Sequence, residues 1–89
     1  MEQRLTRAPD VLAEELDGEF LLLRAGSAHA VHLDPVASAM WRVLQQPVSE
    51  DELALALADG FEVEVGRVTG DLGPALAMLR QHGLVVDEP

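Results

Sequence analysis

The feature that most constrains this chain is a change of hydrophobic period at Asp34-Pro35. Before this point apolar residues recur about every second residue, as in a strand, and after it about every 3.6 residues, as in a helix. Pro fixes φ near the helical value and lacks the N–H that a first helical turn would leave unpaired. Asp34 is therefore the predicted N-cap, because its carboxylate can accept from the free N–H groups that follow. A small sheet must then be joined directly to a helical core.

Composition narrows the class of protein. With 89 residues the chain predicts one domain, and 6 basic against 16 acidic residues give a net charge of −10, which repels nucleic acid and anionic membranes. The absence of Cys excludes a disulfide framework and a thiolate metal site. We see no signal peptide at the start and no run approaching the roughly 18 apolar residues of a membrane span. These features predict a cytoplasmic protein that binds neither nucleic acid nor membrane.

A hairpin is predicted at Asp17-Gly18, since this pair suits a two-residue turn in which both central residues have positive φ. It would join strands over Val11–Leu16 and Phe20–Arg24. The second of these is apolar from Phe20 to Leu23, which indicates a strand that is central in its sheet or covered on both faces.

A third strand is predicted at Ala28–Leu33, after a turn at Ala25-Gly26-Ser27. The period of two puts Val31 and Leu33 toward the core. Residues 1–10 are polar and are interpreted as a tail, either frayed or in a short edge contact.

The second helix should begin with a capping box, because Ser49 is followed three residues later by Glu52. It is predicted to end near Asp59, with Gly60 in the left-handed conformation beyond its C-terminus. Its predicted buried residues are Leu53, Ala56 and Leu57, and Phe61, Val63 and Val65 in the following connection are expected to point inward.

The third helix is predicted at Val65–His82, capped by Gly83. Its predicted buried stripe consists of Val68, Leu72, Ala75, Leu76 and Leu79. Gly73-Pro74 should kink the helix or make it start afresh, because Pro deletes one backbone hydrogen bond. Residues 84–86 return as a short extended segment.

The element order is three strands and then three helices, the second and third helices forming a helix-turn-helix arrangement. With the segments APDVLAEELDGEFLLL, HLDPVASAMW, SEDELALALADGFEVE and LRQHGLV, the chain resembles PqqD-type proteins, also called RiPP recognition elements. The resemblance covers about Ala8 to Val86. It implies an α+β fold, a winged helix-turn-helix with a three-stranded antiparallel sheet followed by three helices. We place this domain at residues 11–86, between tails at residues 1–10 and 87–89.

The resemblance also implies a function. Such domains bind the leader segment of a ribosomally made precursor peptide and present it to a modifying enzyme, for example a radical-SAM enzyme or a leader protease. In the family the leader adds as a strand to the sheet edge beside the third helix, because an exposed edge offers unpaired N–H and C=O groups. The residues carried over as peptide-binding are Ala28, His29, Ala30, Val31, His32 and Leu33 from the strand, and Asp71, Ala75, Met78 and His82 from the helix.

Those four helical residues share one flank by helical spacing. The opposite flank, with Thr69, Gly73 and Arg80, is the alternative wall. Family members often carry aromatic residues in the third strand and Asn before the first helix. The small residues and Asp34 found here predict a roomier pocket.

No chemistry of its own is predicted for the chain. We find no nucleophile-and-base motif, no phosphate loop and no cofactor motif. His29 and His32 lie three positions apart on a predicted strand, so they point to opposite faces and cannot share a metal ion. Trp41 is interpreted as a core anchor. We therefore predict no catalytic, cofactor-binding or metal-binding residues.

Two other classes of function remain as alternatives. A winged-helix DNA-binding regulator would need a basic recognition helix, but the predicted one has only Arg67 and Arg80 against Asp71. A structural or oligomerisation domain would pair the exposed strand with its own copy in a homodimer. The peptide-binding reading is preferred.

Overall fold

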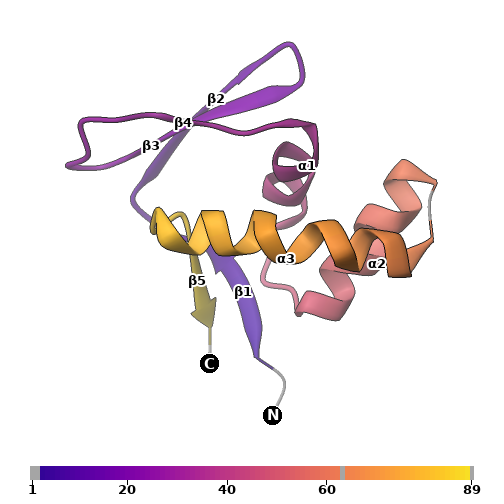
Figure 1. Cartoon of the computed structure of the whole chain (residues 1–89). Coiled ribbons are helices and arrows are strands. Elements are labelled where there is room, and N and C mark those ends of the chain that lie inside the picture. Colours follow the sequence, from indigo (N-terminus) through magenta and orange to yellow (C-terminus); the bar gives the residue numbers. More distant parts are fainter. Residues whose placement is uncertain (1–2, 63, 89) are drawn as a thin grey trace.

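The computed structural model of the chain describes residues 3–62 and 64–88. In chain order its elements are β1 (Arg4–Arg7), β2 (Val11–Leu16), β3 (Glu19–Arg24), β4 (Val31–His32), α1 (Pro35–Val43), α2 (Glu50–Phe61), α3 (Val65–Gln81) and β5 (Val85–Glu88). Strands β2, β3 and β4 form a three-stranded antiparallel sheet, called the wing sheet below, and three helices follow it. The predicted α+β fold is confirmed. In Figure 1 the wing sheet stands above α3, and β1 and β5 extend side by side below it.

The β2–β3 hairpin forms where it was predicted. Asp17 and Gly18 have φ values of 53° and 84°, as a two-residue turn of this kind requires. Strand β3 is central in the wing sheet, and Leu22 is fully buried beneath it. Leu23 on the other face is 36% exposed, so the apolar run reflects a central position in the sheet and not cover on both faces.

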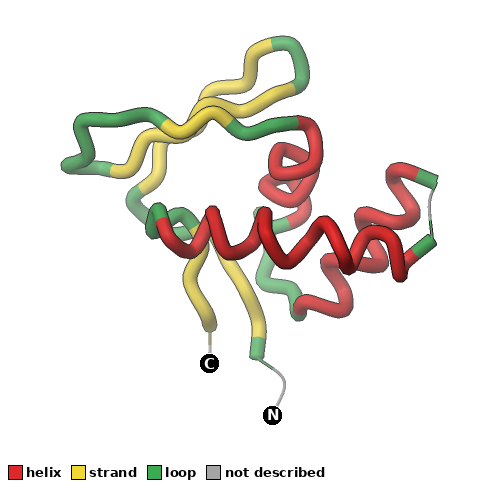
Figure 2. The backbone as a smooth tube through the Cα atoms, viewed as in Figure 1, coloured by secondary structure: helices red, strands yellow, loops and turns green. Residues whose placement is uncertain are grey.

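Strand β4 is shorter than predicted. Only Val31–His32 is strand, paired with Leu22 and Leu21, whereas residues 28–30 belong to the loop that is green in Figure 2. The prediction of a strand from Ala28 was wrong because local bonds compete with the sheet. The Ser27 hydroxyl accepts from the His29 N–H at 3.3 Å and donates to the His29 carbonyl at 3.2 Å, which turns the chain.

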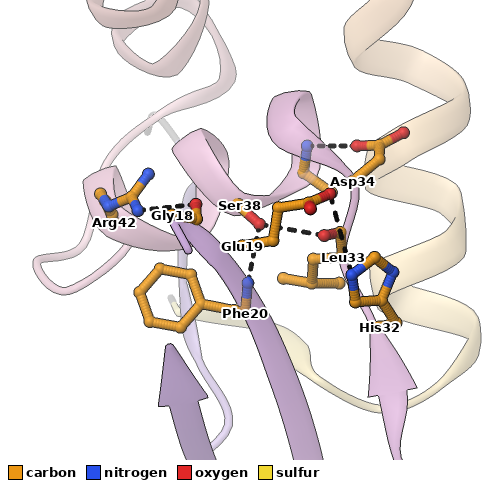
Figure 3. A network of polar contacts seen from close by, with 9 residues as sticks. Gly18, Glu19, Phe20, His32, Leu33, Asp34, Ser38 and Arg42 are labelled. Atoms are coloured by element: carbon orange, nitrogen blue, oxygen red, sulfur yellow. Dashed lines mark hydrogen bonds and ion pairs between the residues drawn. The ribbon is translucent and has the colours of Figure 1, made fainter. Parts of the chain in front are cut away.

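Helix α1 begins as the change of period predicted. The Ala37 N–H donates to the Asp34 carboxylate at 2.8 Å, and Pro35 is the first helical residue. The wholly buried Ser38 hydroxyl accepts from the Phe20 N–H at 3.0 Å and donates to the Leu33 carbonyl at 3.1 Å. The hydroxyl thus bridges the Phe20 N–H and the Leu33 carbonyl, which would otherwise bond directly in the sheet (Figure 3). It links β3 and the end of β4 to the helix.

Helix α2 has the predicted capping box, with Ser49 and Glu52 bonded reciprocally at 3.1 Å. Its predicted end was wrong: the helix passes through Gly60 to Phe61, and Glu62 takes the left-handed conformation with φ 56°. Because Gly60 is helical, Phe61 belongs to α2 and lines a cavity between α2 and α3. Phe61 is still 44% exposed.

The buried stripe of α2 is also shifted from the prediction. It consists of Leu53, Ala54, Leu57 and Ala58, whereas Ala56 is exposed. The inward orientation expected for Val63 lies outside the described residues.

Helix α3 is continuous from Val65 to Gln81, so it does not start afresh at Gly73-Pro74. Four of the five residues of the predicted stripe are buried, and Ala75 is half-buried. Pro74 leaves the Gly70 carbonyl without its helical donor. This is tolerated because Gly70 and Gly73 are exposed, and water can hydrate that side of the helix. None of the helices within the described residues is long and apolar enough to span a bilayer.

Strands β1 and β5 pair from Arg4↔Glu88 to Arg7↔Val85, and these residues include parts of both predicted tails. Leu5 is 1% exposed and packs in the core, so the N-terminal segment is ordered through its edge contact and not frayed. A single Leu in a polar stretch does not reveal a strand whose partner lies at the far end of the chain.

The Arg7 guanidinium fixes β1 to α1. It lies 4.4 Å from the centroid of the Trp41 ring and donates to the Trp41 carbonyl at 3.0 Å. Burial lowers the pKa of Arg7, but a guanidinium stays charged. Trp41 is 2% exposed, which confirms its predicted role in the core.

Candidate peptide-binding site

Strand β4 leaves hydrogen-bonding groups free at the edge of the wing sheet. The Leu33 N–H donates to the Phe20 carbonyl at 2.8 Å. Antiparallel pairs alternate between bonded and non-bonded, so Val31 also faces β3 and the pair of His32 with Leu21 is non-bonded. The N–H and C=O of His32 therefore point away from the sheet. A visiting strand would find one donor and one acceptor there.

Two separate hollows lie near this edge, one between the start of α1 and α3 and the other between β4 and the end of α3. The larger, about 500 Å³, is lined by Asp34, Val36 and Ala37 at the start of α1 and by Asp71, Pro74, Ala75 and Met78 of α3. The smaller, about 240 Å³, is lined by Arg24, Ser27, His29, Ala30, Val31, His82 and Leu84. We call the two together the β4–α3 groove.

The β4–α3 groove brings together seven of the ten predicted peptide-binding residues. Asp71, Ala75 and Met78 line its larger part, and His29, Ala30, Val31 and His82 line the smaller. The other three differ from one another. Ala28 is exposed in the loop, and His32 is exposed at the free edge with its ring nitrogen 3.7 Å from the Glu19 carboxylate (Figure 3). Leu33 is wholly buried, so its side chain is part of the core.

The opposite flank of α3 is engaged elsewhere. Arg80 pairs with Asp87 of β5 at 3.0 Å and with Glu50 of α2 at 3.7 Å. Of the two alternatives for the wall, the one with Asp71, Ala75 and Met78 is the flank that borders a hollow beside β4. Its apolar members and Val36 would accept an apolar side chain of a guest.

Sequence reasoning missed the contributions of α1 and of Pro74. Val36 of α1 is half-buried and lines the groove, although no role in the site was predicted for it. Pro74 was treated as a helix breaker, yet it lies on the wall next to Ala75. The helical spacing of Pro74 from Asp71 and Met78 was the signal that could have identified it.

The charges around the groove are mostly acidic or already paired. Asp34 and Asp71 line it, and Arg24 pairs with Asp10 at 3.2 Å. Since Arg80 is held by two acids, α3 lacks the basic face that a DNA-recognition helix needs. Across the part of the chain that the structure describes, no group of three His, Cys, Asp or Glu side chains could hold a metal ion.

A winged helix-turn-helix domain with an open strand edge beside its third helix is thus the class that fold and groove define. The model of the family described as coenzyme PQQ synthesis protein D (PqqD) matches residues 19–85. The chain belongs to the PqqD family, which confirms the resemblance predicted from its motifs.

A solved structure, "TbiB1 in Complex with the TbiA(beta) Leader Peptide", is similar over the whole fold. It shares 25% sequence identity and a TM-score of 0.79, covering 90% of this chain and 93% of TbiB1. TbiB1 in that structure is bound to a leader peptide. No curated protein matches the chain.

Proposed function

We propose that this protein captures the leader of a ribosomally synthesised precursor peptide by strand addition at β4 and presents it to a modifying enzyme. The single observation that carries the proposal is the outward-facing main chain of His32, whose neighbour Val31 lines the smaller part of the β4–α3 groove. Membership of the PqqD family and the likeness to TbiB1, a leader-bound protein, support it.

The leader strand would exchange two main-chain hydrogen bonds with His32. Because side chains of a strand alternate, every second leader residue would then point toward α3 and the next would point away. Those pointing toward α3 would meet Ala75, Met78 and Val36, so we expect the leader to have apolar residues there. The loop at residues 28–30 would extend β4 toward its predicted length once a partner strand lies opposite.

The proposed activity is binding and presentation, and the covalent chemistry would belong to the partner enzyme. We expect that enzyme to be a radical-SAM enzyme or a leader protease. The bound leader would be held on its strand side only, which leaves its other main-chain edge open to the enzyme.

Titration with the synthetic leader of the precursor encoded beside this chain's gene tests the proposal. We expect micromolar affinity, equivalent to about −8 kcal/mol. In amide NMR spectra the largest shifts should fall on residues 30–33 and 71–82, and hydrogen exchange of the His32 amide should slow. Shifts confined to β2, or a dimer that ignores the leader, would contradict the proposal and favour the oligomerisation alternative.

A further inference from the structure

A third hollow extends from the β4–α3 groove toward α2. Its volume is about 260 Å³, and its apolar lining consists of Val36, Leu57, Phe61, Val68 and Leu72. Arg67 and Asp71 complete the lining and are exposed. We call this hollow the α2–α3 pocket. Of its apolar lining residues, Leu57, Val68 and Leu72 are buried, Val36 is half-buried and Phe61 is 44% exposed.

The pocket is continuous with the groove. Val36 and Asp71 line both, so the two hollows meet at these side chains. Along α3 the lining passes from Met78 in the groove to Val68 in the pocket, ten positions and therefore about 15 Å of helix. An extended peptide of about five residues covers that length.

The direction of β4 leads a guest strand to this pocket. After His32 the chain turns into α1 at Asp34, so the sheet edge ends, and Val36 comes next. A leader paired with His32 that continues in this direction would leave the sheet and pass over the start of α1. It would then reach the α2–α3 pocket, which shares Val36 and Asp71 with the larger part of the groove.

The size and polarity of the pocket specify the guest group. A cavity of about 150 Å³ lined by apolar side chains can hold benzene, so this one has room for a larger ring or branched chain. A charged or amide group would lose its water among the apolar side chains, since the two charged residues of the lining, Arg67 and Asp71, are exposed. A second copy of this chain is a poor occupant, because two molecules of net charge −10 repel each other.

We propose that the α2–α3 pocket is the end subsite of the leader site and takes one large apolar side chain, aromatic or branched aliphatic, from the part of the leader beyond the β4-paired strand. This inference rests on the function proposed above. It assigns Phe61, Val68 and Leu72 a role in selecting the leader sequence.

The test uses the same synthetic leader and two variants of α2. Phe61→Ala removes the exposed wall of the pocket, and Leu55→Ala removes a side chain that is 57% exposed and does not line it. We expect the dissociation constant to rise at least fivefold for Phe61→Ala and to stay within twofold for Leu55→Ala. Thermal unfolding of both variants checks that they remain folded.

A peptide series identifies the guest residue. Each large apolar residue of the leader is replaced by Ala in turn, and one replacement should weaken binding about tenfold to the wild-type protein but less than threefold to Phe61→Ala. This non-additivity is expected only if the two side chains meet. Intermolecular NOEs from that leader residue to the methyl groups of Val68 and Leu72 should be seen with the unmodified protein.

Failure of this inference is distinguishable from failure of the proposed function. If the His32 amide shifts but Val68 and Leu72 give no NOEs and Phe61→Ala binds normally, the subsite is refuted and strand addition stands. If NOEs reach Val68 while His32 is unperturbed, strand addition is refuted and the pocket stands. An absence of any leader binding refutes both.

Discussion

The two edges of the wing sheet are formed by β2 and β4, and they offer a visiting peptide different things. Strand β2 has six residues and β4 has two. Both expose main-chain groups: the Ala25 N–H donates to the Asp10 carbonyl at 2.8 Å, so by alternation Ala13 faces away from β3. By backbone alone, β2 would be the better template.

What separates the two edges is their surroundings. Strand β2 is almost wholly exposed and carries Glu14 and Glu15, and such charges protect an edge from unwanted pairing. Strand β4 leads directly into the start of α1, which forms an apolar wall with α3. Strand β2 also borders a hollow, formed with β3 and Ala30, so the proposed site differs from it in the helical wall that α3 and the start of α1 supply.

The largest effect should come from removing the edge donor itself. His32→Pro deletes the outward N–H of β4, and Ala13→Pro deletes the equivalent N–H of β2 as a matched control. Loss of the partner for a leader carbonyl costs about 1 to 3 kcal/mol, so leader binding should weaken roughly 5- to 150-fold for His32→Pro. Calorimetric titration measures it. Equal losses for both variants would show that the leader does not distinguish the edges.

A carboxylate in the groove should have the next largest effect. Ala75→Glu places charge and bulk against the guest strand, whereas Ala77→Glu puts the same group on an exposed position of the same helix. We expect about tenfold weaker leader binding for Ala75→Glu and a change within twofold for Ala77→Glu. Fluorescence anisotropy with a labelled leader measures both. Unchanged binding by folded Ala75→Glu would remove α3 from the site.

Alignment of β4 should matter less for binding but more for stability. Ser38→Ala leaves the Phe20 N–H and the Leu33 carbonyl without their shared partner, at a cost of about 2 to 3 kcal/mol in unfolding free energy. Urea denaturation measures this cost, and Ser27→Ala in the exposed loop is the control. Leader binding should weaken about threefold, because the edge is less well held. If Ser38→Ala is as stable as the wild type, the pairing of β4 with β3 is sufficient to align β4.

The smallest effect concerns a group far from both edges. Two interactions with Ser49 lower the pKa of Glu52 below its ordinary value of 4.5. The larger is the hydrogen bond from the Ser49 N–H, and the smaller involves the Ser49 side chain. The contribution of Glu52 to stability is therefore present above the unfolded-state pKa and is lost as pH falls through the lower folded-state pKa.

Glu52→Gln provides the measurement. Its urea midpoint should lie slightly below that of the wild type near pH 6, and the gap should close as the pH falls through the lowered pKa of folded Glu52. Leader affinity at neutral pH should be unchanged. A gap that persists in acid would show that the capping box depends on the side-chain shape and not on its charge.

The features predicted well from sequence are those decided by neighbouring residues. Asp17-Gly18 specifies its hairpin turn, Asp34-Pro35 its helix start, and Ser49 with Glu52 its capping box. Each depends on contacts within about four positions, and the amino-acid types alone determine whether those contacts form.

The features missed depend on competition or on distance. The hydrogen bonds of Ser27 hold residues 28–30 in a loop, although they were predicted to be strand. Gly60 was predicted to end α2, although the helix continues to Phe61. Because Phe61 was expected in a loop and not in α2, the sequence did not indicate a pocket between α2 and α3. Helical spacing predicts that Asp71, Ala75 and Met78 share one flank of α3. Only the tertiary structure shows that the start of α1 lines the same hollow as this flank.

The β1–β5 pairing has a consequence for how the molecule assembles. Leu5 faces Asp87, 82 positions later, so closing this pair requires the ordering of nearly the whole chain. Loop-closure entropy grows with that separation, and contacts of high contact order form slowly. We therefore expect the hairpin and the helices to form first and the two ends to join last. The Leu5 main chain also bonds Val48, so β1 can take its place before β5 arrives, and the strand edge and its helical wall are formed when β5 closes the fold.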